Sequence, residues 1–261
     1  MLPESIVQFF ANAQDILWIC TISIDLLVTL LLYRLFGRVG LYGVVVLNIM
    51  LSNLQGPKLT MVFGMPTSLG VILYSGIYFA TDLLSEKYGK REASFAVWLG
   101  FASSLVVVLI MTISLLFIPA TESQGVHNAL MLLFGFTPRF VFGSLFAYLV
   151  SQSLDVWIYH YLKEKTKGRH LWLRNNVSTL TSQALDTILY SLVVWWGIVD
   201  LDMAIQLGLA KYMFKFIIAL LDTPFIYWAR SWDVKDKDWC VSQQEEQERF
   251  GNNIDKNKPK D

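Results

Sequence analysis

The sequence predicts an all-α protein that crosses a membrane several times, and three observations support this fold class. First, 54% of the 261 residues are hydrophobic and only 16% are charged, which is too apolar for an ordinary soluble domain. Second, the apolar residues form seven runs, each near the roughly 20 residues that a helix needs to cross a bilayer. Third, Lys and Arg gather in alternate connections. We therefore expect a polytopic membrane protein with seven transmembrane helices.

The seven runs predict helices that follow one another along the chain. The second run is short and is followed by Gln55-Gly56-Pro57, which predicts a broken outer end. Charged and amide residues dominate from 231 to 261, which we interpret as a polar tail. The expected helices cover residues 16–36, 39–54, 67–85, 93–118, 139–162, 176–198 and 203–228.

Basic residues predict the orientation of the chain. Lys and Arg follow the first, third, fifth and seventh runs, whereas the other connections carry almost none. Between the second and third runs only Lys58 occurs. Because Lys and Arg favour cytoplasmic loops, we expect the N-terminus outside the cell and the C-terminus, with the tail 231–261, in the cytoplasm.

Composition and motifs exclude several classes of function. The net charge is zero and no basic face is present, so we expect no nucleic acid to be bound directly. Cys20 lies in an apolar run and Cys240 in the tail, so neither a disulfide nor a redox site is expected. The sequence has no ATP-binding glycine loop and no hydrolase or metalloprotease motif. We therefore expect no enzyme, no cofactor and no metal.

A polar pattern occurs twice inside the apolar runs. Ser151-Gln152-Ser153-Leu154-Asp155 returns 31 residues later as Ser182-Gln183-Ala184-Leu185-Asp186. In a helix, the Gln and Asp of each copy lie on one face. Because a charge near the bilayer centre costs about 2.5 to 3.5 kcal/mol, we interpret the two stripes as two walls of a solute site. The alternative is that the Gln side chains only hold helices together by hydrogen bonding.

Two other runs carry ionisable stripes. In run 67–85 and just beyond it, Tyr78, Asp82 and Glu86 recur every four residues. We expect Asp82 to serve the site, and Glu86 either to act as a gate or to belong to an interfacial charge cluster. In run 203–228, Lys215 lies near mid-depth on one face with Lys211 and Asp222, where a cation needs a carboxylate or a polar ligand. The alternative for Lys215 is a purely structural ion pair.

The first two runs give weaker signals. The second run ends in Asn53-Leu54-Gln55-Gly56-Pro57-Lys58, which could supply amide groups and unwound backbone to a binding site, as broken helices do in transporters. It could equally be an outer loop. Asp25 is a lone acid between Thr21 and Thr29, and we interpret it as a packing or assembly contact.

Four blocks lie in order between residues 48 and 228. They are Leu51-Ser52-Asn53 with Tyr78 to Leu83 and Tyr88-Gly89; Phe146 to Tyr148 with Gln152 to Val156; Ser178 to Leu180 with Asp186-Thr187; and Tyr212 to Lys215. These blocks resemble the queuosine precursor transporter family, also described as vitamin uptake transporters. That resemblance implies six membrane helices in residues 39–230, with an additional helix in residues 1–38. It also implies an importer of 7-deazaguanine compounds in the bacterial inner membrane.

The expected site suits such a ligand. A guanine-like edge offers two adjacent N–H donors to a carboxylate and one carbonyl to a Gln or Lys, and aromatic rings could stack on the base. We expect one of Asp155 and Asp186 to accept from the base, and the other, with Lys215, to balance charge or carry a proton. The candidates for substrate binding are Gln152, Asp155, Gln183, Asp186, Lys215, Asn53, Asp82, Tyr78 and Phe79. The candidates for a gate or for charge balance are Lys58, Glu86, Lys211 and Asp222.

Three functions remain open at this stage. The preferred one is a secondary or facilitative importer of queuosine precursors for tRNA modification, with the nitrile, the aminomethyl form or queuine as substrate. The second is a substrate-capturing membrane subunit that needs a separate ATPase. The third is an assembly protein whose polar stripes only join helices. The expected partners are the small molecule and the lipid bilayer, and the Trp- and Phe-rich faces also permit a homodimer.

Overall fold

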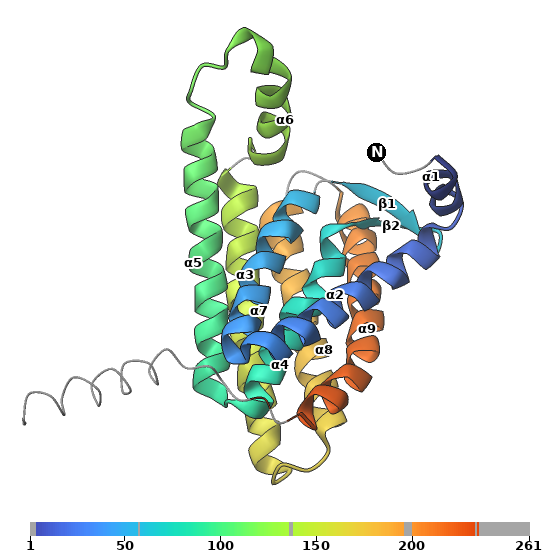
Figure 1. Cartoon of the computed structure of the whole chain (residues 1–261), viewed down its shortest axis with the longest axis vertical. Helices are drawn as coiled ribbons and strands as arrows, with labels where there is room; N and C mark the ends of the chain where they lie inside the picture. Colours follow the sequence, from blue (N-terminus) through green and yellow to red (C-terminus); the bar gives the residue numbers. More distant parts are fainter. Residues whose placement is uncertain (1–3, 57, 136–137, 196–199, 233, 235–261) are drawn as a thin grey trace, which may run out of the picture.

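The computed structural model describes residues 4–56, 58–135, 138–195, 200–232 and 234, and most of them are helical (Figure 1). A helix coincides with each of the seven predicted runs, although residues 196–198 of the sixth lie outside the described residues. The predicted tail 231–261 also lies outside the described residues, apart from residues 231, 232 and 234. The elements are α1 (Glu4–Ala11), α2 (Gln14–Phe36), α3 (Arg38–Gln55), β1 (Leu59–Val62), β2 (Met65–Ser68), α4 (Gly70–Lys87), α5 (Lys90–Ser114), a 3-10 turn (Thr121–Ser123), α6 (Gln124–Phe134), α7 (Pro138–Lys165), α8 (Leu171–Tyr190), a π turn (Ser191–Trp195) and α9 (Leu201–Arg230).

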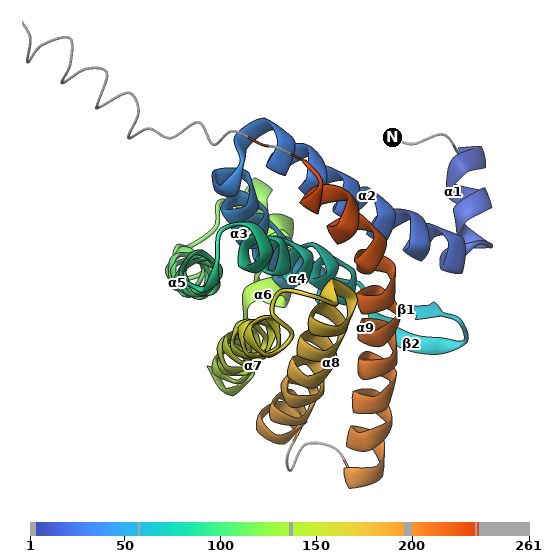
Figure 2. The same cartoon turned by 90° about the horizontal axis from the view of Figure 1, so that it is seen from below.

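The helix α4 lies in the middle of the bundle. It contacts α2, α3, α5, α7 and α9, and the view from below shows it between them (Figure 2). Fifteen of its 18 residues are buried. A helix that is buried on every side belongs to a core, so the polar residues of α4 face other helices.

The outer surface of the bundle is apolar, whereas its interior is rich in polar groups. Helices α2 and α5 expose large apolar side chains, among them Ile24, Leu31, Leu109 and Ile110. Among the described residues, these two helices are long and apolar enough to cross a membrane by length and composition. The other long helices carry buried polar side chains on the faces that meet inside the bundle. An apolar exterior around a polar interior is typical of membrane proteins with a solute pathway.

The first long helix, α2, runs obliquely across the bundle and is tied to it by Asp25 (Figure 1). The Asp25 carboxylate accepts hydrogen bonds from Asn48 Nδ2 (2.8 Å), Ser75 Oγ (2.8 Å) and the backbone N–H of Gly76 (2.9 Å). A Cβ at residue 76 would collide with both Asp25 and Asn48, so glycine permits this close approach. The predicted packing contact of Asp25 is confirmed.

A short hairpin was not predicted from the sequence. Strands β1 and β2 pair antiparallel, with Val62 opposite Met65. Phe63 and Gly64 connect them with φ angles of 50° and 73°, the left-handed conformation that two-residue hairpin turns require. The backbone N–H of Phe63 donates to Asp15 Oδ1 over 2.6 Å, which fixes the hairpin against α2. The third long helix therefore begins at Gly70 instead of the predicted residue 67.

Helix α9 changes direction towards its C-terminal end (Figure 2). Pro224 lies inside the helix and has no N–H to donate to the carbonyl of Leu220, which is a usual cause of a bend. Asp222 lies before the proline and Arg230 after it. The two ends of α9 therefore contribute to different groups of polar residues.

Candidate functional site

Polar side chains from α4, α7, α8 and α9 meet inside the bundle. Each has at most 3% of its surface exposed, which is rare for charged residues unless they are paired or bind something. We call this set the central polar cluster. Its members are Asp82, Gln152, Asp155, Thr179, Ser182, Gln183, Asp186, Lys215 and Asp222.

Within the cluster, Asp186 holds the positive charges. Lys215 Nζ lies 2.5 Å from Asp186 Oδ2, and Lys211 Nζ lies 3.6 Å from the same oxygen. The two lysines are one turn apart on α9 and therefore reach the same side. The Lys215 ammonium also lies over the ring of Tyr74, 4.8 Å from its centroid. Asp186 is thus a neutralised carboxylate.

The two copies of the sequence repeat bond to each other. Ser182 Oγ donates to Asp155 Oδ1 over 3.0 Å, and Ser151 Oγ lies 3.5 Å from Asp186 Oδ1. The serine of each copy therefore serves the aspartate of the other. Because α7 and α8 run antiparallel, one local two-fold relationship produces both contacts. This exchange gives a physical reason for the repeated spacing.

Two further carboxyl groups are held by the same stretch of α8. Asp82 accepts a hydrogen bond from Thr179, and Asp155 accepts one from Ser182, one turn further along that helix. Thr179 Oγ1 donates to Asp82 Oδ2 over 3.3 Å. In the described part of the chain, Asp82 Oδ1 and Asp155 Oδ2 have no hydrogen-bond donor.

Several other polar atoms of the cluster are also unsatisfied. Gln152 Oε1 lies 3.5 Å from the hydroxyl of Thr81, but its Nε2 has no partner among the described residues. The same holds for Gln183 Oε1 and for Asp222 Oδ2, whose other oxygen accepts from Asn175 over 3.1 Å. Buried polar atoms without a partner are unusual in proteins. The cluster therefore offers one amide donor and several acceptors to a ligand.

Two small cavities lie between the helices, and Tyr74 lines both. Each has room for about one water molecule. The first, which we call the inner cavity, lies between α4, α8 and α9 and is lined by Tyr74, Tyr78, Thr179, Gln183, Lys215, Ile218 and Asp222. The second, the outer cavity, is lined by Ile49, Ser52, Asn53, Tyr74, Ser144, Leu145 and Tyr148.

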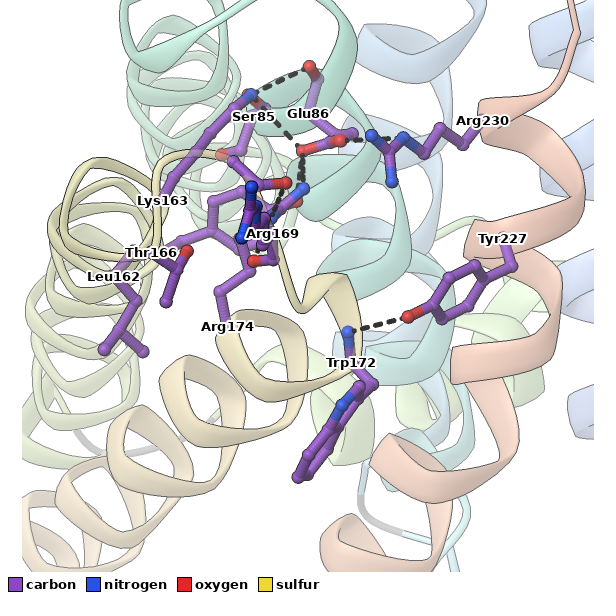
Figure 3. A network of polar contacts seen from close by, with 12 residues as sticks. Ser85, Glu86, Leu162, Lys163, Thr166, Arg169, Trp172, Arg174, Tyr227 and Arg230 are labelled. Carbon is purple, nitrogen blue, oxygen red and sulfur yellow. Dashed lines mark hydrogen bonds and ion pairs between the residues drawn. The ribbon is translucent and has the colours of Figure 1, made fainter.

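A second charged group closes the end of the bundle where α7 joins α8 (Figure 3). Glu86, one helical turn beyond Asp82, receives Arg174 at 2.6 Å, Lys163 at 3.2 Å, Arg230 at 3.1 Å and the hydroxyl of Tyr159 at 3.0 Å. The side chain of Glu86 is 6% exposed and that of Arg174 is fully buried. This Glu86 cluster joins α4, α7, α8 and α9.

Residues 68–229 match the sequence model of a family described as "Putative vitamin uptake transporter". A "Probable queuosine precursor transporter" of Bacillus subtilis (strain 168) is 39% identical over 214 residues, covering 82% of this chain and 93% of the relative. The chain belongs to the vitamin uptake transporter family. It is also 26% identical over 163 residues to the "Queuosine precursor transporter" of Escherichia coli (strain K12), covering 61% of this chain and 71% of that protein. A "Probable queuosine precursor transporter" of Haemophilus influenzae (strain ATCC 51907 / DSM 11121 / KW20 / Rd) is 27% identical over 163 residues, covering 61% and 66%.

Membership of the vitamin uptake transporter family makes the chain a membrane protein. No solved structure matches it. The family match begins inside the β hairpin and ends one residue before the end of α9, so it includes all four helices of the central polar cluster.

The structure brings most of the predicted site residues of this transporter-family chain together. Nine of them belong to the central polar cluster, contact it or line the inner cavity: Asp82, Gln152, Asp155, Gln183, Asp186, Lys211, Lys215, Asp222 and Tyr78.

The other predicted residues lie elsewhere. Phe79 is buried in the apolar core and lines neither cavity. Asn53 is exposed and lines the outer cavity, and Lys58 is exposed just before β1. Glu86 is the centre of its own cluster, where it forms ion pairs with three basic side chains. Trp157 of α7 is 52% exposed, so it is not buried with the central polar cluster.

Sequence reasoning missed Arg174 and Asn175. Arg174 was counted among the basic residues of a cytoplasmic connection, yet it is buried and binds Glu86, 88 positions away in the sequence. Asn175 donates to Asp222. Both continue the polar stripe of α8 at four-residue spacing, since Ser178 follows Arg174 and Thr179 follows Asn175, and this periodicity could have identified them.

Proposed function

We propose that this chain is an importer of queuosine precursors and that the central polar cluster binds a 7-deazaguanine base. One observation carries the proposal: the cluster holds unsatisfied donors and acceptors beside a cavity with aromatic walls, in a chain whose relatives are named queuosine precursor transporters. We assign secondary or facilitative transport to a chain that carries no ATP-binding motif of its own.

The chemistry of the inner cavity fits a base with a guanine-like edge. The free oxygen of Asp222 can accept from the adjacent ring N–H and exocyclic amine, while Lys215 can donate to the carbonyl. Gln183 Oε1 offers one more acceptor. Tyr74 and Tyr78 line the same cavity, and a base stacked on an aromatic ring gains about 1 to 3 kcal/mol. Lys215 and Lys211 neutralise Asp186, which supports a charge-balancing role for that residue.

The polar groups of α7 complete the proposed site. Gln152 Nε2 is a donor without a partner among the described residues, and Asp155 has one oxygen with no donor. Both residues are fully buried beside α4 and α8. We assign Gln152 to the bound base and Asp155 to the handling of charge next to it.

We also propose the membrane arrangement of the chain. Seven helices, α2 to α5 and α7 to α9, cross the bacterial inner membrane with the N-terminus outside and the C-terminus in the cytoplasm. The apolar outer faces of α2 and α5 support this arrangement, and so does the gathering of Lys163, Arg174 and Arg230 at one end. Residues 39–230 would form the transporter core and residues 1–38 the additional helix.

Passage of a base requires the helices to separate. Each cavity has room for about one water molecule, so a bicyclic base does not fit without movement. We assign the side of the outer cavity, with Asn53 and Lys58, to entry from outside, and the Glu86 cluster to the inner gate. Tyr74 separates the two cavities and would have to move first. Alternating access of this kind is usual for secondary transporters.

Uptake by the purified protein in liposomes tests the proposal. The substrates are radiolabelled 7-cyano-7-deazaguanine, its aminomethyl analogue and queuine, with guanine and adenine as competitors. We expect uptake of at least one deazaguanine, competition by guanine at higher concentration and none by adenine, whose edge reverses the donor pattern. Binding without uptake would instead support a substrate-capturing subunit. The absence of both binding and uptake would refute the proposal.

A further inference from the structure

Three buried carboxyl groups have no cation bonded to them in the described part of the chain: Asp82, Asp155 and Asp222. Their exposed fractions are 1%, 0% and 1%. Each has one oxygen without a hydrogen-bond donor among those residues. The basic side chains nearby are bonded elsewhere, because Lys211 and Lys215 bind Asp186.

The basic side chains of the Glu86 cluster are also bonded to another carboxylate. Arg174, Lys163 and Arg230 all bind Glu86, at the end of the bundle. Ionised carboxylates are costly to bury without a partner, and two of them side by side also repel each other. The basic residues that the structure describes are therefore not bonded directly to the three carboxyl groups, and a bound proton would lower the cost of burying them.

Two neutral amide oxygens near the three carboxyl groups also lack a hydrogen-bond donor among the described residues. Asn175 Oδ1 and Gln183 Oε1 are carbonyl oxygens of residues that are 1% and 2% exposed, and neither receives a hydrogen bond from a described residue. Two amide oxygens and three carboxyl oxygens thus lack donors in one small region. No set of three acidic, His or Cys residues in the described parts converges closely enough to hold a metal ion. A proton is the positive charge that needs only two oxygens.

We propose that Asp82 and Asp155 share a proton, and that this pair is where the importer takes up a proton that enters with the base. The geometry is suitable because Thr179 and Ser182, which are neighbours one turn apart on α8, donate to Asp82 and Asp155, and each carboxyl group keeps one oxygen free of described donors. The hydroxyls of Thr179 and Ser182 hold the other two oxygens. The inference rests on the proposed transport function.

The groups that face the pair leave the proton in place. Tyr78 and Glu86 lie on α4 beside Asp82, Tyr159 on α7, Asp186 on α8, and Asp222 and Lys215 on α9. Lys215 is bonded to Asp186 and Arg174 to Glu86, so neither cation is bonded to the pair itself. Asp222 is the one facing carboxyl group that is not bonded to a described cation, and its negative charge would favour a proton on the pair.

The pair also provides a means of coupling. When the bundle is open, water can solvate two ionised carboxylates, but closure removes that water. Closing over two negative charges is unfavourable, whereas closing over a shared proton is not. The closed form therefore carries the proton, and opening to the cytoplasm releases it.

Uptake of neutral 7-cyano-7-deazaguanine into liposomes tests the inference, because this substrate contributes no charge of its own. With the outside one pH unit more acidic, one proton per base predicts about tenfold accumulation, together with acidification of the lumen reported by a trapped pH dye. Asp82→Asn and Asp155→Asn should abolish accumulation but keep exchange of labelled for unlabelled base in preloaded liposomes. Asp25→Asn removes a buried carboxyl group whose donors are all in place, and should keep the response to pH.

The outcomes separate the two proposals. Uptake that does not depend on the pH gradient, or that depends on a sodium gradient instead, would overturn the proposed proton pair. It would not contradict the proposed import function. Absence of uptake and exchange for every deazaguanine would overturn the importer. In that case infrared spectroscopy still tests the pair: we expect a protonated-carboxyl band near neutral pH that Asp82→Asn loses and Asp25→Asn retains. A wild-type spectrum that both variants leave unchanged would refute it.

Discussion

The ammonium of Lys215 lies 2.5 Å from the carboxylate of Asp186, and both side chains are almost completely buried. The pair joins α8 to α9 inside the bundle, beside the inner cavity that Lys215 also lines. The pair connects two helices, and under the proposed function Lys215 would also be a hydrogen-bond donor to the base.

Replacing Lys215 separates these roles. Lys215→Met leaves Asp186 buried with only Lys211 nearby, so we expect the free energy of unfolding to fall by about 3 to 5 kcal/mol. The double variant Lys215→Met, Asp186→Leu removes both charges and should recover most of that loss without recovering uptake. Thermal unfolding in detergent and uptake in liposomes measure the two effects.

Lys211→Met is the matched control on the same face of α9. Its ammonium is 3.6 Å from Asp186 and its side chain is 21% exposed, so the cost should be about 1 kcal/mol or less. A loss as large as that of Lys215→Met would contradict the assignment of Lys215 as the main partner.

Asp222→Asn should weaken substrate binding without weakening the fold. Asp222 has one oxygen without a described donor, so removing its charge lowers the cost of burial. A charge-assisted hydrogen bond contributes about 1.5 to 3 kcal/mol, so we expect affinity for the base to fall at least about tenfold. The midpoint of unfolding should stay the same or rise. Asp202→Asn, at an exposed position in the first turn of α9, should change neither quantity.

Glu86→Gln should both destabilise the protein and open the inner gate. Three basic side chains would lose their shared carboxylate, at a cost of about 3 to 5 kcal/mol. A cysteine placed at buried Ser178, with Cys20 and Cys240 replaced by Ser, should react faster with an impermeant thiol reagent applied from the cytoplasmic side. Labelling at the wild-type rate would argue against a gate.

Glu92→Gln provides the comparison for Glu86. Glu92 forms an ion pair with Arg38 at 3.5 Å, with side chains that are 26% and 30% exposed. Partly exposed pairs contribute about 0 to 1 kcal/mol. We expect a small loss of stability and no change in thiol labelling.

Alanine at two glycines should act in opposite directions. Gly76→Ala places a Cβ against Asp25 and Asn48, and overpacking of this kind costs about 1 to 3 kcal/mol. Gly43→Ala, inside α3 with nothing within 4 Å of the new Cβ, should stabilise by about 0.4 to 1 kcal/mol. Opposite shifts in the midpoint of unfolding would verify the contact, and equal shifts would refute it.

Local periodicity carried much of the information about this fold and its candidate site. A polar residue that recurs every three or four positions inside an apolar run has to face another helix, and Gln152, Asp155, Gln183 and Asp186 do so. Lys215 followed from charge alone, because a cation at mid-depth needs a partner. The sequence also predicted that this partner is either Asp155 or Asp186.

Features that depend on partners far apart in the chain could not be predicted. Arg174 has the sequence context of a loop cation, and only the packing of α8 beside α4 brings it to Glu86. The hairpin at 59–68 escaped prediction because its strands have four residues each and merge into the apolar pattern. Which aspartate would hold Lys215 depends on the rotation of α8 against α9, which no periodicity determines.

The three bonds to Asp25 set a lower limit on the size of a fragment that can fold. The family match starts at residue 68, yet deleting everything before α3 would leave Asn48, Ser75 and the Gly76 N–H without their common acceptor. It would also remove Trp18, Ile22 and Leu26, which α2 contributes to the apolar core. A shortened version for biophysical work should therefore begin before Gln14. Cutting at the edge of the shared family region would yield a protein that aggregates instead of a smaller transporter.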